Sequence, residues 1–200
     1  SSDLGTPEEN SRIITAAARH LGAATVGFVE LDDETTRKLI YDEQPNRDNR
    51  KIIFENIDEG YITDDLIVIP RKARYAISYT THMSGETMQR CPTLTGGNTT
   101  GLSYTRMWNT YAMLHEFIRG IGWNSYGTTS FNGLGIYPAM AVMAGLGEMS
   151  RLNRMITPEY GPMVRTVFML TDLPLAPTKP ISFGVMKFCE SCKRCADLCP

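Results

Sequence analysis

The chain has 200 residues, 42% of them hydrophobic and 21% charged, and carries a formal net charge of −2. This length and composition suffice for a globular domain with a buried core, whereas the small negative charge argues against a nucleic-acid partner. No run of about 18 apolar residues predicts a membrane span. Because the sequence starts at Ser1 without an initiator Met or a targeting segment, we expect the natural N-terminus to lie outside it.

The first predicted element is a helix that begins at Thr6-Pro7-Glu8-Glu9. Thr6 is the predicted N-cap, Pro7 suits the first helical position, and Glu9 completes a capping box. The helix should stop at Gly22, because glycine favours the C-terminal cap. A strand over residues 24–31 and a short helix over residues 33–41 follow. Three more segments rich in β-branched and aromatic residues predict strands at 51–57, 66–69 and 74–80.

The second half begins with a polar stretch, residues 82–100, whose Pro92, Gly96 and Gly97 predict a long loop. Residues 102–121 have the strongest helical pattern, with apolar side chains at steps of three and four. The elements expected after it are a loop over 123–135, a short apolar helix over 138–144, an irregular segment over 149–161, a strand over 163–170 and a proline-rich connector over 172–180.

Helices and strands alternate along the chain, which favours an α/β (α+β) fold. The proline-rich connector then predicts a boundary, with a body over residues 1–180 and a separate module over residues 181–200.

The last twelve residues carry the sharpest chemical pattern. Four cysteines follow the spacing Cys-x2-Cys-x2-Cys-x3-Cys-Pro, at Cys189, Cys192, Cys195 and Cys199. This spacing is typical of bacterial-type [4Fe–4S] binding, in which the fourth cysteine ligates a second cluster. A zinc site would more often pair two Cys-x2-Cys knuckles across a longer gap. The missing ligands should lie past Pro200, so we expect these residues to be a piece of a longer protein that holds two clusters, and the piece alone to hold neither in its native form.

Several segments together resemble the corrinoid-dependent reductive dehalogenases of organohalide-respiring bacteria. They are G-L-G-E-M-S-R at 145–151, I-T-P-E-Y-G-P at 156–162, T-D-L-P-L at 171–175, K-F-C-E-S-C-K-R-C-A-D-L-C-P at 187–200 and H-E-F-I-R-G-I-G-W at 115–123. The resemblance implies a nitroreductase-like domain that binds a base-off cobamide, followed by the start of a ferredoxin-like [4Fe–4S] module. It also implies replacement of a halogen by hydrogen in small organohalides, with chlorinated ethenes expected.

The resemblance further implies where and with what the protein works. Members of the family usually carry a twin-arginine signal, act at the outer (periplasmic) face of the cytoplasmic membrane, and dock to a small membrane anchor protein. Their electrons come from a donor of the respiratory chain.

The family's proton donor is a tyrosine, which the resemblance places at Tyr104, expected at the opening of the strong helix. An ordinary phenol has a pKa of about 10 and gives up its proton readily only beside a cation. Arg165 would be that cation, with Arg151 and Arg154 as rivals, and Asn132 would orient substrate or bond the phenol.

Glycine-rich loops are the candidates for holding the cobamide, because backbone N–H groups suit its amides and phosphate. They contain Gly96 and Gly97, Gly133 and Gly135, and Gly145 and Gly147. No histidine lies in an Asp-x-His-x-x-Gly pattern, which agrees with base-off binding.

Two other functions stay open at this point. An epoxyqueuosine-reductase-like enzyme would share the corrinoid and the cysteine pattern, but it acts on tRNA and should show clustered Lys and Arg. A ferredoxin-like electron carrier would need little of the long body that precedes the cysteines.

Overall fold

The computed structural model describes residues 5–43, 50–127 and 133–199. Its helices are α1 (Pro7–His20), α2 (Gly85–Met88), α3 (Leu94–Gly120), α4 (Tyr137–Met143), α5 (Val185–Cys192) and α6 (Arg194–Asp197), with a 3-10 helix η1 at Arg37–Leu39. Its strands are β1 (Thr25–Glu30), β2 (Lys51–Glu55), β3 (Tyr61–Ile62), β4 (Leu66–Pro70), β5 (Tyr75–His82), β6 (Ser125–Tyr126), β7 (Glu148–Met149), β8 (Met155–Ile156) and β9 (Val164–Thr171).

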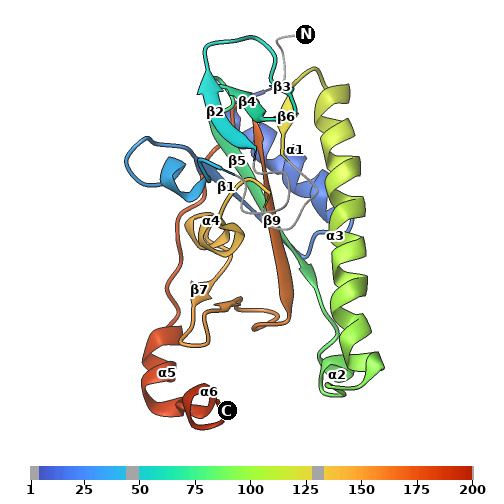
Figure 1. Ribbon diagram of the computed structural model, residues 1–200, viewed down its shortest axis with the longest axis vertical. Helices are drawn as coiled ribbons and strands as arrows, with labels where there is room; N and C mark the ends of the chain where they lie inside the picture. The colour runs from blue at the N-terminus through green and yellow to red at the C-terminus, as the bar shows by residue number, and fades with distance from the viewer. Residues whose placement is uncertain (1–4, 44–49, 128–132, 200) are drawn as a thin grey trace.

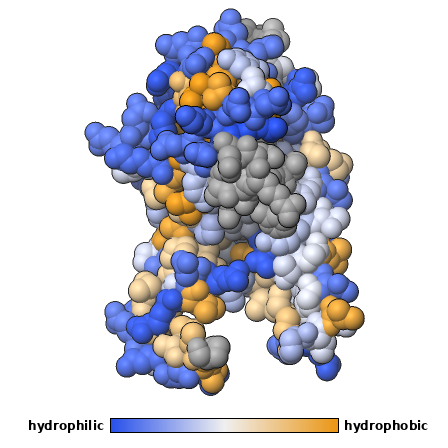
Figure 2. Space-filling view, viewed as in Figure 1, coloured by the Kyte–Doolittle hydropathy of each residue, from blue (hydrophilic) through white to orange (hydrophobic). Residues whose placement is uncertain are grey.

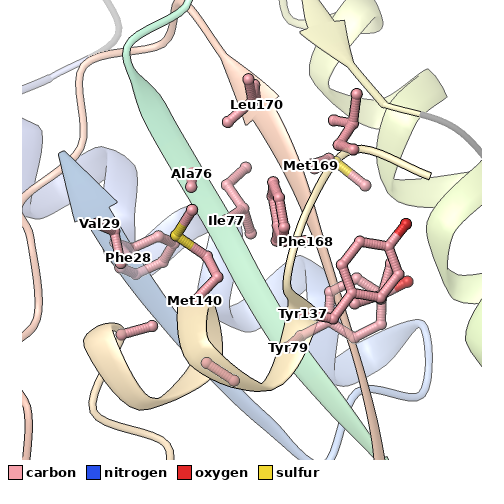
Figure 3. Packing of buried hydrophobic residues seen from close by; sticks show 14 of the residues in the cluster. Phe28, Val29, Ala76, Ile77, Tyr79, Tyr137, Met140, Phe168, Met169 and Leu170 are labelled. Carbon is pink, nitrogen blue, oxygen red and sulfur yellow. The ribbon is translucent and has the colours of Figure 1, made fainter. Parts of the chain in front are cut away.

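An antiparallel sheet of order β1-β5-β9-β6 forms the centre of the molecule, with helices on both faces (Figure 1). Tyr79 of β5 points to one face, where its hydroxyl donates to Met107 O of α3. Phe168 of β9 points to the other face and packs edge-on against Tyr137 of α4. Side chains alternate across a strand, so the buried residues in Figure 3 form two apolar layers. The mixed α/β prediction is therefore confirmed.

Local sequence signals predicted the first helix correctly. The Thr6 side chain accepts from Glu9 N, and Thr6 N donates to the Glu9 carboxylate at 2.8 Å, which completes the capping box. The predicted strands over 24–31, 51–57, 66–69, 74–80 and 163–170 are also confirmed, with small shifts at their ends.

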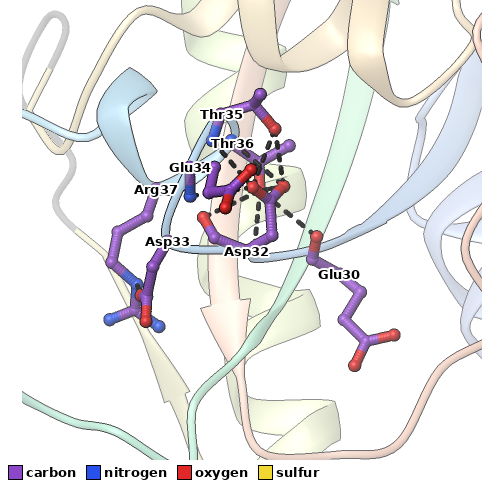
Figure 4. Close-up of polar contacts among 7 residues, drawn as sticks. All are labelled: Glu30, Asp32, Asp33, Glu34, Thr35, Thr36 and Arg37. Atoms are coloured by element: carbon purple, nitrogen blue, oxygen red, sulfur yellow. Dashed lines mark hydrogen bonds and ion pairs between the residues drawn. The ribbon is translucent and has the colours of Figure 1, made fainter.

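The predicted helix at 33–41 is wrong, apart from the three residues of η1. Asp32 lies two residues after β1, and its carboxylate accepts from the backbone N–H groups of Glu34, Thr35 and Thr36 at 3.0, 2.7 and 3.3 Å (Figure 4). The Thr35 and Thr36 hydroxyls add to these bonds and hold the pKa of Asp32 well below its usual range. Such local side-chain bonds compete with helix formation, and here the chain forms a turn instead.

The predicted loop at 82–100 is also wrong, because it contains α2 and the first turns of α3. Thr93 caps α3 through a bond from Gly96 N to its hydroxyl at 3.4 Å. A Cβ on Gly96 would lie 2.5 Å from Cys91 N, so this glycine lets the turn between α2 and α3 lie close against the first turn of α3. Packing therefore overrides the low helix propensity of glycine.

Gly27 is where β1 meets the end of α4. A Cβ at Gly27 would lie 2.2 Å from Ala144 O, too close for either backbone to remain in place. Gly101, in contrast, is an exposed residue of α3, and a Cβ added there would have no neighbour within 4 Å.

We expect Gly27→Ala to lower the free energy of unfolding by about 1–3 kcal/mol, because added volume in a packed core forces the backbone to shift. Gly101→Ala should raise it by about 0.5–1 kcal/mol, because alanine loses less entropy in a helix. Urea denaturation of both variants measures these changes. A Gly27→Ala protein as stable as its parent would show that β1 and α4 can separate without cost.

Candidate functional site

Arg165 and Tyr104 come together although one lies on β9 and the other on α3. Arg165 pairs with Thr81 of β5, and Thr81 bonds to Ser103 of α3, so this register turns Arg165 towards the helix. Its Cζ lies 5.1 Å from the centre of the Tyr104 ring, and its Nη2 donates to Thr100 Oγ1 at 3.3 Å. Thr100 and Tyr104 are four residues apart and share one face of α3.

Tyr104 is not at the opening of the helix, as the sequence suggested, but well inside α3, which begins at Leu94. The error follows from the missed helical turns at 94–101. The helix interior gives Tyr104 a firmer backbone than a helix end would, because interior turns do not fray.

A cavity of about 230 Å³ opens beside this pair. Its other lining residues, both apolar and polar, come from α3, α4, the β7–β8 hairpin, β9 and the turn before β9. They are Met107, Trp108, Tyr137, Pro138, Asn153, Arg154, Met155, Pro162, Val164 and Thr166. Figure 2 shows the molecule hollowed between the lower end of α3 and the segment that carries α5 and α6. Of the two rival arginines, Arg154 lines the cavity and Arg151 does not.

The charged side chains described at the cavity's walls are all positive. Two arginines line it, and no carboxylate does among the residues described at its walls. The Nε of Arg165 is buried and has no hydrogen-bond partner in the described part of the chain. A buried donor without a partner is costly, so this guanidinium can still stabilise negative charge that forms next to it.

The remaining predicted site residues have mixed placements. Asn132 lies outside the described residues. The amides of Gly97, Gly133 and Gly145 already donate within the protein, to Thr93 O, the Tyr137 hydroxyl and Val142 O, each at 3.0 Å.

Packing explains two further glycines. A Cβ on Gly135 would meet Leu39 O at 2.2 Å, and one on Gly147 would meet Ile156 O at 2.3 Å. Close backbone approach therefore accounts for glycine at these positions, and a role of the six glycines in holding a cofactor stays a prediction.

The cysteine segment forms two short helices, α5 and α6, joined at Lys193, whose φ is 51°. Cys189, Cys192 and Cys195 line a second, largely apolar cavity of about 480 Å³, whereas Cys199 is exposed and lies off it. No three His, Cys, Asp or Glu side chains of the described residues are close enough to hold a metal ion. A cluster held by these thiols therefore stays a prediction.

Two of the three histidines, His115 and His82, make contacts away from both cavities. His115 Nδ1 bonds to Ser125 Oγ, and burial lowers the pKa of this imidazole. His82 packs on the Tyr160 ring at 4.8 Å. In the parts of the chain that the structure covers, no helix has the length and apolar character to cross a membrane.

Comparisons with known proteins point to one family. The family model described as "Reductive dehalogenase subunit" matches residues 2–175. The chain is 37% identical to the tetrachloroethene reductive dehalogenase of Sulfurospirillum multivorans over 99% of its length, and 33% identical to the trichloroethene reductive dehalogenase of Dehalococcoides mccartyi over 98%. It spans 41% of the length of each of these relatives.

Solved structures agree on the fold. The catabolic reductive dehalogenase NpRdhA superposes on the whole chain with a TM-score of 0.79 at 24% identity, covering 26% of that protein. Its complex with 3-bromo-4-hydroxybenzoic acid gives a TM-score of 0.76 at 25% identity over the same 26%. The epoxyqueuosine reductase of Bacillus subtilis is 39% identical over only 31% of this chain and 15% of its own length.

Proposed function

The chain belongs to the reductive dehalogenase family, and we propose that it forms the substrate-reducing part of a corrinoid-dependent reductive dehalogenase. The overall reaction takes an organohalide, two electrons and one proton, and gives the hydrogen-substituted product and a halide ion. Electrons come from a low-potential donor of the respiratory chain, and the proton comes from the enzyme.

The placement of the Arg165 guanidinium over the Tyr104 ring carries this proposal. Tyr104 donates the proton as the carbon–halogen bond breaks, and the charge of Arg165 stabilises the phenolate that remains. The guanidinium is held by Thr100 and has a buried Nε without a partner among the described residues, so it is already in place before negative charge develops. Asn132 orients the substrate or the phenol.

The size of the cavity supports a small substrate. A cavity of about 230 Å³ is large enough for a chlorinated ethene. The tetrachloroethene and trichloroethene enzymes among the relatives support small chlorinated alkenes as substrates.

The cavity suits a cobamide only as one wall of its site, because a corrin ring is larger than this space. When bound in base-off form, the cobamide supplies the cobalt reductant that breaks the carbon–halogen bond. The residues that would face it are the exposed lining residues Asn153 and Arg154 on the β7–β8 hairpin, together with the glycine-containing segments near Gly135 and Gly147. We propose that the body around them is a nitroreductase-like domain, as the family resemblance implies.

The cysteine segment is proposed to begin a ferredoxin-like module with two [4Fe–4S] clusters. The shared cavity of Cys189, Cys192 and Cys195 supports one cluster for these three, and the separate, exposed position of Cys199 supports its role in the other. Location at the periplasmic face of the membrane, export by a twin-arginine signal and docking to a small anchor protein rest on family membership alone.

The test is anaerobic purification of the enzyme with its cofactors, followed by chloride release from tetrachloroethene and trichloroethene with reduced viologen as electron donor. We expect bound corrinoid, bound iron and sulfide, and chloride formed in proportion to viologen oxidised, two viologens per chloride. Absence of corrinoid from the active fraction would overturn the proposal. Turnover of an epoxyqueuosine-containing tRNA stem loop would favour the alternative enzyme instead.

A further inference from the structure

The β7–β8 hairpin separates the two cavities. On β8, Met155 lines the cavity of Tyr104 and Arg165, whereas its neighbour Ile156 lines the cavity of the cysteines. Neighbouring residues of a strand point to opposite faces, so a single strand forms the partition. Pro162 lines both cavities, which makes the wall between them one layer of chain thick.

Helix α5, which carries Cys189 and Cys192, lacks a cap from its own sequence. Its N-cap residue is Gly184, with φ of 90° and no side chain that could accept a bond. The first N–H groups of a helix need acceptors from elsewhere. Here the acceptor comes from the hairpin, far away in the sequence.

Glu148, the first residue of β7, supplies that acceptor. Its Oε2 accepts from Phe183 N at 2.7 Å and from Val185 N at 3.1 Å, and its Oε1 accepts from the Ser182 hydroxyl at 3.1 Å. The bond from Phe183 N contributes most to holding the pKa of Glu148 below its usual range. A carboxylate is also favoured at this end of a helix by the helix dipole.

We propose that Glu148 is the positioning residue that fixes the cluster-bearing helix α5 to the wall of the catalytic cavity. This inference rests on the proposed function, because it takes the three cysteines as cluster ligands. It also gives a role to the acidic residue of the G-L-G-E-M-S-R segment. Without the carboxylate, the start of α5 would open more often, and Cys189 and Cys192 would lose their fixed place beside Ile156.

The test compares Glu148→Ala with Glu148→Gln in the enzyme loaded with its cofactors. Alanine removes all three bonds, whereas the glutamine carbonyl can still accept from Phe183 N and Val185 N. Glu159→Ala is the matched control, because Glu159 is an exposed carboxylate on the turn that follows β8. The readouts are hydrogen exchange at the amides of residues 183–189, the rate of iron loss to a chelator, and corrinoid content.

We expect Glu148→Ala to exchange these amides faster and to lose iron about two- to tenfold faster. Water can replace part of each of the three bonds, which leaves a net loss of about one hydrogen bond. Glu148→Gln should lie near the parent, and corrinoid content should be unchanged in all three variants. If Glu148→Ala and its parent lose iron at the same rate, the proposed role of Glu148 is wrong, and the proposed function is not affected. A parent enzyme that binds neither iron nor corrinoid would instead overturn the proposed function.

Discussion

Replacing Tyr104 by phenylalanine is expected to lower the turnover number for halide release by about 10²–10⁴-fold, the contribution typical of a positioned general acid. Phenylalanine keeps the ring that lies against the Arg165 guanidinium and removes only the hydroxyl. Packing of α3 and the shape of the cavity should therefore persist. The variant should bind corrinoid and substrate as its parent does, and the defect should appear in kcat rather than KM.

The control for this experiment is Tyr160→Phe. Tyr160 packs on His82 outside the catalytic cavity, so loss of its hydroxyl should leave halide release unchanged. Chloride formation and product analysis with reduced viologen measure both variants. Full activity of Tyr104→Phe would remove this phenol from the mechanism.

Local sequence patterns predicted some helices and strands of this chain and missed others. The first helix was predictable because its cap lies within four residues, Thr6 to Glu9. Several strands were predictable because they are rich in β-branched and aromatic residues. Residues 82–100 were not, because Gly96 and Gly97 are helix breakers by local propensity. Their helical state depends on Thr93 as a cap and on the packing of α2 against α3.

The candidate site depends on contacts that no local pattern encodes. Nothing in the spacing of Tyr104 and Arg165 says that β9 pairs with β5 in the register that turns Arg165 towards α3. The likeness to a family named both residues, and the fold explains why they meet. The hairpin was hidden because its strands have two residues each, too short for alternation to be recognised. As a result, the sequence showed neither the wall between the two cavities nor the bonds of Glu148.

Arg165→Gln is the second change with a large expected effect, a loss of about 10²–10³-fold in kcat, as for removal of one group that stabilises developing charge. Glutamine takes away the positive charge and the terminal nitrogen that bonds to the Thr100 hydroxyl, but keeps a polar side chain on β9. Because the phenolate charge exists only as the proton leaves, the loss should fall on kcat and leave KM nearly constant. The kcat of Arg165→Lys should lie between those of the parent and Arg165→Gln, because an ammonium keeps the positive charge but not the planar guanidinium.

Arg154→Gln decides between the two arginines of the cavity. Arg154 is exposed on the hairpin, and its backbone oxygen, not its guanidinium, makes its contacts with Ser150. Arg165 is partly buried, lies over the Tyr104 ring and is held by Thr100. Water screens an exposed charge more than a buried one, so Arg165 should stabilise the phenolate more strongly at equal distance. Arg154→Gln is therefore expected to cost less in kcat than Arg165→Gln at every pH tested. The reverse order would make Arg154 the cation that supports the proton donor and would leave Arg165 a role in packing α3 against β9.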